Sequence, residues 1–320
     1  MKSFAYLIAE SFGAAARALS KGANTVAKAG GTDLLDRLKE RVVEPDEVLH
    51  LLRIEAEESK GEISALATLA EIADDEWVKK DFPALQRAAA EAATPQIRNV
   101  GTLGGNLCQH TRCWFFRDPS FPCFKRGTGS CSAMEEGAQN RYHAVFPGES
   151  CASAHPSNLA PALIALGAKV ECVHPDGDRT LDAELLYQQP LNGVHDDTVL
   201  RKGELIRAVK LEASDLTRRS TYVEFRERQS FDFALASVAV ALDLRDGVVK
   251  QARIVCGAVA PVPLRATTAE QAITGKRLDE AAIAAAAAAV AEGAAPLEQN
   301  KYKLVILKDL VRQALEELKS

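Results

Sequence analysis

The chain has 320 residues, of which 47% are hydrophobic and 26% charged, and its formal net charge is −5. These values are typical of a soluble globular protein large enough for two or three hydrophobic cores. Acidic and basic residues are interspersed, and the basic stripe needed to bind a phosphate backbone is missing, so we expect no nucleic-acid partner. The longest weakly polar run, residues 283–290, is too short to span a bilayer, so we expect no membrane insertion.

The N-terminal residues lack the long apolar run and cleavage site of a secretory peptide, which predicts a cytoplasmic protein. The chain carries seven cysteines, an odd number. In a protein that is not exported, free thiols and metal ligands are more common than disulfides.

The first third of the chain alternates helices with short strands, which favours an α+β fold over one regular parallel sheet. Ser11 is the expected N-cap of the first helix, and Thr32 or Asp33 that of the second. The predicted helices cover residues 11–19, 34–39, 66–73 and 82–92, and the predicted strands cover residues 25–29, 48–52 and 62–64.

Residues 94–156 show little periodicity and are rich in glycine, proline, cysteine and aromatic side chains. A loop of this length is uncommon in a compact protein unless something orders it, and a bound metal would do so.

Regular patterns return after residue 157. They predict a helix over 158–166, strands over 169–173, 204–211, 222–228, 236–244 and 248–256, and helices over 278–292 and 301–318. The last three strands are joined by turns such as 245–247 and predict an antiparallel meander. A polar segment at 213–220 is the expected domain boundary.

Two glycine turns stand about seventy residues apart. Residues 28–35 offer successive small residues ahead of a helix N-terminus, an arrangement suited to a pyrophosphate, although paired glycines alone are more often a simple tight turn. The second turn, 101–106, repeats the pattern. Thr32, Asp33, Thr102 and Asn106 are therefore candidate contacts to the phosphates and sugar of a cofactor.

Four cysteines, Cys113, Cys123, Cys131 and Cys151, follow the second turn. Their spacing lacks the close pairs of zinc sites, whereas a cubane iron–sulfur cluster tolerates wide spacing because each iron takes one thiolate. Nearby aromatic and basic side chains would shield the thiolates and offset their charge. Four free or structural cysteines remain the alternative, and His110, His143 and His155 are expected to form hydrogen bonds or pack rather than bind metal. Cys172 and Cys256 lie in strand patterns and are expected in the core.

The two turns resemble the flavin-binding signature of the medium subunits of the xanthine dehydrogenase and carbon monoxide dehydrogenase family. Further blocks at 153–163, 203–206, 222–234 and 297–304 extend this similarity over essentially the whole chain. The resemblance implies an FAD-binding domain of the vanillyl-alcohol-oxidase (PCMH) type over residues 1–215, with subdomains 1–55 and 56–215. It also implies a C-terminal domain over 216–320, built from an antiparallel sheet with helices.

The resemblance also implies the residues that contact FAD. They are Val26, Ala27, Lys28, Ala29, Gly30, Gly31, Thr32, Asp33, Leu34, Thr102, Gly104, Gly105, Asn106, His155, Asn158, Ile206 and Glu224. Ile206 would lie against the isoalloxazine. Two positions depart from the family, because Asn158 stands where many relatives have Asp and Glu224 where many have Lys. The change at position 224 removes a positive charge near the flavin. The reduction potential of the flavin and its preferred electron acceptor therefore do not follow from the resemblance.

Most medium subunits lack the cysteine insertion, which covers about residues 108–152. It resembles the 4Fe-4S loop of 4-hydroxybenzoyl-CoA reductase and, more closely, that of bacterial periplasmic aldehyde oxidoreductase. That likeness implies Cys113, Cys123, Cys131 and Cys151 as cluster ligands and leaves Cys108 a buried free thiol.

No catalytic nucleophile–base motif is visible, so the chemistry is expected to belong to cofactors. The resemblance implies the FAD and 4Fe-4S electron-transfer subunit of a heterotrimeric molybdenum hydroxylase that oxidises aldehydes to carboxylic acids. The partners would be a large subunit with the molybdenum cofactor, a small subunit with two 2Fe-2S clusters, and an external electron acceptor. The alternatives are a subunit of a 4-hydroxybenzoyl-CoA reductase, a subunit of a purine or N-heterocycle dehydrogenase, and a zinc-binding scaffold without flavin. Export on a partner that bears a twin-arginine signal would place the complex in the periplasm instead.

Overall fold

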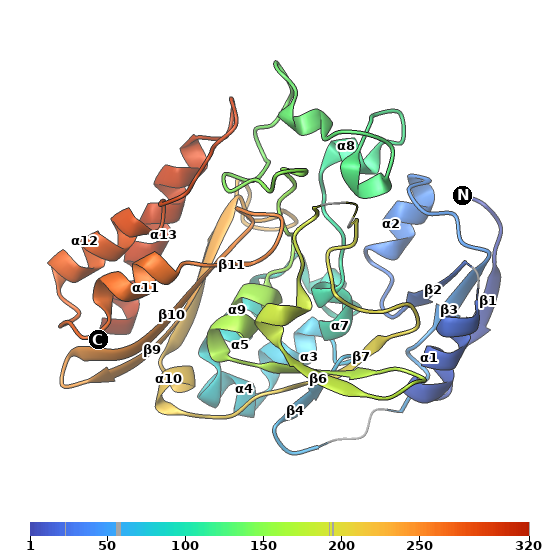
Figure 1. The fold of residues 1–320 in the computed structure, drawn as a ribbon. Coiled ribbons are helices and arrows are strands. Elements are labelled where there is room, and N and C mark those ends of the chain that lie inside the picture. Colours follow the sequence, from blue (N-terminus) through green and yellow to red (C-terminus); the bar gives the residue numbers. More distant parts are fainter. Residues whose placement is uncertain (23, 56–58, 192, 194, 320) are drawn as a thin grey trace.

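A computed structural model describes residues 1–22, 24–55, 59–191, 193 and 195–319. The N-terminal unit is a three-stranded parallel sheet in the order β1-β3-β2, formed by β1 (Ala5–Ile8), β3 (Glu47–His50) and β2 (Thr25–Lys28). Helices α1 (Phe12–Lys21) and α2 (Leu34–Lys39) accompany this sheet (Figure 1). Ser11 caps α1 as predicted, since its hydroxyl accepts a hydrogen bond from the amide of Ala14 at 3.2 Å.

The second unit contains a four-stranded antiparallel sheet in the order β4-β7-β5-β6. Its strands are β4 (Glu62–Ser64), β7 (Leu205–Lys210), β5 (Lys169–Val173) and β6 (Arg179–Asp182), and a 3-10 turn, η3 (Ala183–Leu186), follows β6. Helices α3 (Leu69–Asp74), α4 (Glu76–Asp81), α5 (Pro83–Glu91) and α9 (Leu159–Leu166) complete the unit. The predicted subdomain boundary between residues 55 and 56 falls at 56–58, outside the described residues.

The C-terminal unit is an antiparallel sheet in the order β11-β10-β9-β8. It contains β8 (Ser220–Phe225), β9 (Ala236–Arg245), β10 (Val248–Gly257) and β11 (Leu264–Arg265), and it confirms the predicted meander. Helices α11 (Thr267–Ile273), α12 (Glu280–Ala289) and α13 (Tyr302–Lys319) cover one face of this sheet (Figure 1). A short helix, α10 (Asp215–Arg218), lies in the polar segment where the sequence predicted only a boundary.

The largest hydrophobic core lies between these two antiparallel sheets. Leu85 of α5 and Leu163 of α9 are fully buried there, together with Val170 of β5 on one side and Ala239 of β9 on the other. The opposite face of the C-terminal sheet forms a second core with α11, α12 and α13. The burial of both faces explains why β9 begins with seven consecutive buried residues instead of alternating.

The irregular segment is folded although it contains little secondary structure. Its elements are α6 (Pro95–Arg98), α7 (Leu103–Leu107), α8 (Trp114–Arg117) and two 3-10 turns, η1 (Phe124–Arg126) and η2 (Ser132–Met134). The Arg126 guanidinium donates to the carbonyls of Phe115, Phe116 and Asp118 at 3.0, 2.7 and 2.8 Å. These bonds fold the cysteine-bearing segment into a compact lobe beyond the ends of the central helices (Figure 1). Among the described residues, no helix is long and apolar enough to cross a membrane.

Candidate flavin site and cysteine cluster

The two glycine turns pack directly on each other. A Cβ atom on Gly30 would lie 2.0 Å from the carbonyl oxygen of Val100, immediately before the second turn. Gly31 has φ +79°, a backbone conformation that side chains other than glycine rarely adopt. Glycine is therefore required at both positions to bring the two segments together.

The turns differ in the backbone donors that they leave free. Within the described part of the chain, the amides of Gly30, Gly31, Thr32 and Asp33 have no hydrogen-bond acceptor. Four adjacent free N–H groups ahead of α2 form a concave donor site that suits a phosphate.

In the second turn the amides of Leu103, Gly104 and Gly105 are already used. Leu103 donates to the Ala67 carbonyl at 2.9 Å, Gly104 to the Ala65 carbonyl at 2.8 Å, and Gly105 to the Thr102 hydroxyl at 3.1 Å. These three amides are therefore held by residues 65–67 and by the N-cap of α7, and the predicted contacts of Thr102, Gly104 and Gly105 with FAD stay predictions.

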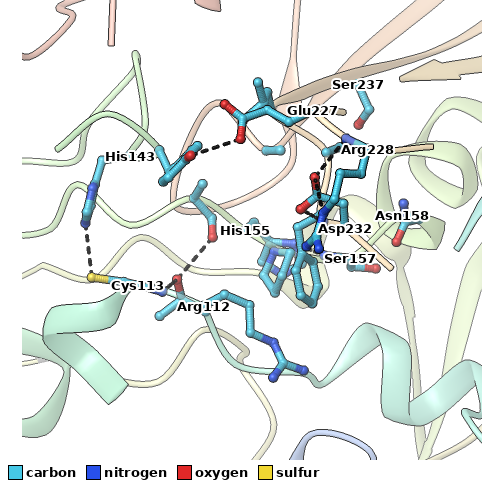
Figure 2. Close-up of a pocket in the computed structure, with 18 of the residues that line it drawn as sticks. Arg112, Cys113, His143, His155, Ser157, Asn158, Glu227, Arg228, Asp232 and Ser237 are labelled. Atoms are coloured by element: carbon cyan, nitrogen blue, oxygen red, sulfur yellow. Dashed lines mark hydrogen bonds and ion pairs between the residues drawn. The ribbon is translucent and has the colours of Figure 1, made fainter. Parts of the chain in front are cut away.

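Two cavities lie between the N-terminal part of the chain and residues of the C-terminal unit, and one of them is lined by both glycine turns. One, of about 330 Å³, is lined by Thr32, Gly101, Thr102, Gly105 and Asn106. The other, of about 390 Å³, is lined by residues of the cysteine lobe, of 154–158 and of 227–237. Figure 2 shows the second cavity, with Cys113 and His143 on one side and Asn158 and Ser237 on the other. Both cavities share Arg112, Asn158, Arg228, Asp232 and Phe233.

His155, one of the residues that line the larger cavity, has a buried ring nitrogen without a partner in the described part of the chain. His155 is 3% exposed, and its Nε2 has no hydrogen-bond partner among the described residues. Burial lowers the pKa of His155 to about 4, so the imidazole is neutral at pH 7. An unpaired buried nitrogen costs free energy unless a ligand satisfies it, and we expect such a ligand in this cavity.

Asn158 and Glu224, the two departures from the family pattern, contact each other. The Asn158 amide donates to Glu224 at 2.7 Å and to the Tyr222 hydroxyl at 3.2 Å. Burial raises the pKa of the Glu224 carboxyl. Arg226 Nε lies 3.0 Å from Glu224 Oε1, so a cation stands next to the position where the sequence analysis noted a lost positive charge.

The structure places Ile206 on β7, 6% exposed and packed in the largest core. Its predicted contact with the isoalloxazine stays a prediction. Val26 and Ala27 belong to β2, and Lys28 and Ala29 lead directly into the first turn.

Asp33 links the first turn to the cysteine lobe. Its carboxylate lies 2.6 Å from Arg117, 3.0 Å from Arg37 and 3.3 Å from Arg112, and it also accepts a hydrogen bond from the amide of His110 at 3.3 Å. Burial alone would raise the pKa of Asp33. The His110 side chain, whose Nδ1 lies 3.7 Å from the carboxylate, and the charges of Arg37, Arg117 and Arg112 outweigh burial and hold this pKa well below its usual value.

The predicted capping role of Asp33 is therefore corrected. Asp33 occupies the N-cap position of α2, but its side chain makes no capping hydrogen bond because the three arginines occupy it. Arg117 comes from α8 and Arg112 precedes Cys113, neighbours that the local sequence pattern of residues 28–35 does not reveal.

We expect Asp33→Asn to destabilise the flavin-free chain by about 3 kcal/mol, because three partly buried guanidinium groups would lose their shared counter-charge. Asp36→Asn is the matched control. Asp36 is 47% exposed and, among the described residues, forms an ion pair with Arg112 alone, so its loss should cost within about 1 kcal/mol. Chemical denaturation monitored by circular dichroism measures both free energies of unfolding.

The pH dependence of the Asp33 effect has a definite sign. The folded-state pKa is depressed, so the stabilisation is present above the ordinary Asp pKa of about 3.9 and is lost as the pH falls below it. The difference between wild type and Asp33→Asn should therefore be constant above about pH 5 and shrink below about pH 4. A difference that stays constant through acid pH would contradict the assigned network.

The four predicted ligand cysteines lie near one another, and all seven cysteines are free thiols. Cys131 and Cys151 are hydrogen-bonded, and this bond lowers the pKa of Cys151 to about 6. Burial raises the pKa of Cys113 to about 12, and its charge interacts with those of Cys151 and Cys123. In the described chain, no three His, Cys, Asp or Glu side chains converge on a position for a single metal ion.

Cys108 is separate from this group. Its electrostatic neighbour is Cys172, and it packs against the largest core. Cys172 and Cys256 are 1% and 0% exposed, which confirms their predicted core positions.

Two contacts of the cysteine lobe have partners that the sequence did not predict. His143 was expected to pack or to form a hydrogen bond, and its imidazole Nε2 lies 3.1 Å from the sulfur of Cys113 (Figure 2). The lobe also contains a buried ion pair between Lys125 and Asp197, whose side chains are 3% and 10% exposed. Cys113 and His143 are thirty positions apart in the sequence, and Lys125 and Asp197 are farther apart still, so no local signal predicts either contact.

Comparison with known proteins identifies the family of this chain. Residues 2–211 match the FAD binding domain in molybdopterin dehydrogenase, and residues 220–318 match the CO dehydrogenase flavoprotein C-terminal domain. The chain is 34% identical to the aldehyde oxidoreductase FAD-binding subunit PaoB of Escherichia coli (strain K12), covering 100% of this chain and 99% of that one. It is 25% identical to the glyceraldehyde dehydrogenase medium chain of Sulfolobus acidocaldarius, covering 98% of each chain.

The fold has solved counterparts. A chain of the carbon monoxide dehydrogenase from Hydrogenophaga pseudoflava aligns with a TM-score of 0.75 at 25% identity, covering 98% of this chain and 96% of that one. The α+β architecture with its C-terminal antiparallel sheet is confirmed by this similarity and by the two family matches. The chain therefore belongs to the FAD-binding medium subunits of the xanthine dehydrogenase and carbon monoxide dehydrogenase family, and it is an oxidoreductase subunit of a molybdenum hydroxylase complex.

Proposed function

We propose that this chain is the FAD- and 4Fe-4S-carrying electron-transfer subunit of a heterotrimeric molybdenum hydroxylase that oxidises aldehydes to carboxylic acids. The observation that carries the proposal is the position of Cys113, which belongs to the cysteine group and also lines the cavity that reaches Asn158. A cluster at the cysteines and a flavin in this cavity would be neighbours.

The residues present fit FAD. The free amides of 30–33 are suited to its pyrophosphate, and the unpaired Nε2 of His155 offers a hydrogen-bonding partner in the larger cavity. Thr102, Asn106 and Asn158 line the smaller cavity between these two places. When bound, FAD supplies the exchange of electrons between one-electron carriers and an acceptor. The protein residues hold the cofactor, exclude water and set the charge around it.

We propose a cubane cluster rather than a single ion at the cysteine group. Cubane ligation takes one thiolate for each iron, which agrees with four separate sulfurs and with the lack of a single-ion position in the described chain. Phe115 and Ala133 are buried around the cysteines and would keep water from them. Lys125 lowers the pKa of Cys151 in addition to the hydrogen bond from Cys131, so the site favours thiolate at one ligand.

The proposed substrate class and partners are inferred from the relatives of this chain. Two full-length relatives are named as subunits of an aldehyde oxidoreductase and a glyceraldehyde dehydrogenase. We propose a large partner with the molybdenum cofactor, where substrate is oxidised, and a small partner with two 2Fe-2S clusters. Electrons would pass through the small partner to this chain and on to an external acceptor.

The proposed domain boundary is residue 215. The two family matches end at 211 and begin at 220, and the helix α10 lies in the interval between them. This interval supports domains of 1–215 and 216–320.

Turnover by the assembled complex tests the substrate class. We expect the specificity constant for benzaldehyde to exceed that for hypoxanthine by at least about a hundredfold. Reduction of 4-hydroxybenzoyl-CoA by a low-potential donor should be undetectable in parallel assays. Preferential oxidation of hypoxanthine would instead indicate a purine or N-heterocycle dehydrogenase. Reduction of 4-hydroxybenzoyl-CoA would indicate a 4-hydroxybenzoyl-CoA reductase.

A further inference from the structure

We propose that His143 donates a hydrogen bond from Nε2 to the sulfur of Cys113 and thereby raises the reduction potential of the cluster. This inference rests on the proposed function, because it requires that Cys113 ligates a 4Fe-4S cluster. His143 is then a residue that tunes the cluster through its ligand and is not itself a ligand.

The contact is close and sheltered. The distance from His143 Nε2 to Cys113 Sγ is 3.1 Å, and His143 is only 3% exposed. The rings of Trp114 and Phe115 lie 5.4 and 5.8 Å from the imidazole. The imidazole is therefore largely shielded from bulk water, which strengthens a hydrogen bond that it donates.

The proton must lie on the histidine. An iron-bound thiolate carries no hydrogen, so it can only accept, and Nε2–H is the donor in the neutral ring. Nδ1 has no partner among the described residues, so no competing acceptor holds the proton on that side of the ring.

The C-terminal unit fixes the position of His143. The backbone carbonyl of His143 accepts hydrogen bonds from Asn300 Nδ2 and Lys303 Nζ, both at 3.1 Å. The backbone amide of His143 donates to the Asn140 carbonyl at 3.0 Å. Asn300 and Lys303 are 0% and 1% exposed. The backbone of His143 is thus held by Asn300 and Lys303, which lie outside the cysteine lobe.

The expected effect on the cluster has a clear direction. A hydrogen bond to a ligating sulfur stabilises the more negative, reduced state of an iron–sulfur cluster and raises its potential. A higher potential would let the cluster take electrons from the neighbouring flavin more readily. Removal of the donor should therefore favour the oxidised cluster.

Two substitutions of His143 separate the hydrogen bond from packing. His143→Leu removes the donor, whereas His143→Gln keeps an amide N–H near the position of Nε2. In a redox titration of the purified chain followed by electron paramagnetic resonance, His143→Leu should shift the reduced-to-oxidised ratio at a fixed potential by about tenfold toward oxidised, which is about 59 mV for one electron. His143→Gln should restore most of this shift, with iron and FAD contents at the wild-type level in both variants.

His174→Leu is the control. His174 contacts the Lys202 carbonyl in a turn of the second unit, so this variant should leave the potential unchanged. A wild-type potential in His143→Leu with full iron content would overturn the inference and leave the proposed function intact. Loss of iron from both His143 variants would also overturn it, because His143 would then be a ligand or a purely structural residue. A wild-type chain without any cluster would instead refute the proposed function.

Discussion

Gly31→Val should abolish most FAD binding, reducing the flavin retained by the purified chain at least about tenfold, which corresponds to about 1.4 kcal/mol of binding free energy. In the proposed function the first turn would bind phosphate through its free amides, in a backbone conformation with φ +79° at Gly31. A β-branched residue cannot keep this conformation without strain of roughly 1–3 kcal/mol, and its side chain would crowd the approach to the amides. The ratio of flavin absorbance to protein concentration measures the result.

Gly275→Val is a matched control for this prediction. Gly275 also has φ +79°, and a Cβ there would meet no atom within 4 Å. Both substitutions should therefore lower the free energy of unfolding by similar amounts, but Gly275→Val should retain FAD at the wild-type level. Equal flavin loss in the two variants would show that backbone strain, rather than the turn, controls flavin retention.

Cys123→Ala should remove most of the iron while leaving FAD in place. A missing ligand should weaken cluster binding by more than the roughly tenfold to hundredfold loss seen when only an outer-shell partner of a metal is removed. The flavin should survive because the first turn and its free amides lie outside the cysteine lobe. Iron by colorimetric assay and FAD by absorbance, on one sample, give both values.

Cys108→Ala tests the exclusion of Cys108 from the ligand set. Cys108 interacts with Cys172 rather than with the four lobe cysteines, so its replacement should leave the iron content unchanged. A loss of iron from Cys108→Ala, with normal iron in Cys123→Ala, would show that Cys108 rather than Cys123 is a ligand.

Much of the fold could be predicted because its signals are local. The cap at Ser11, the helix after Asn158 and the meander of β8, β9 and β10 all follow from caps, turns and apolar runs. Other elements escaped prediction. All four residues of β1 are exposed, so the strand shows no buried face in its pattern. Helices α4 and α11 are short, with six and seven residues, and give little periodicity.

The sequence predicts which residues make up the candidate site but not the hydrogen bonds and ion pairs that join them. Glycine pairs and cysteine spacing identify which segments matter, because the small residues and thiols are visible in the sequence. The engagement of the second turn's amides by Ala65 and Ala67, and the pairing of Asp33 with Arg117, depend on contacts between distant segments. The position of His143 against Cys113 likewise depends on Asn300 and Lys303 at the start of α13. Packing in three dimensions sets these contacts, and no local pattern encodes them.

Elemental and cofactor analysis of the wild-type chain, purified without oxygen, tests the central claim most directly. Iron, acid-labile sulfide, zinc and FAD should be quantified on the same sample. The account predicts about four iron atoms and about four sulfides for each FAD, the composition of one 4Fe-4S cluster beside one flavin. Zinc at the cysteines, or a full complement of FAD without iron or sulfide, would contradict it.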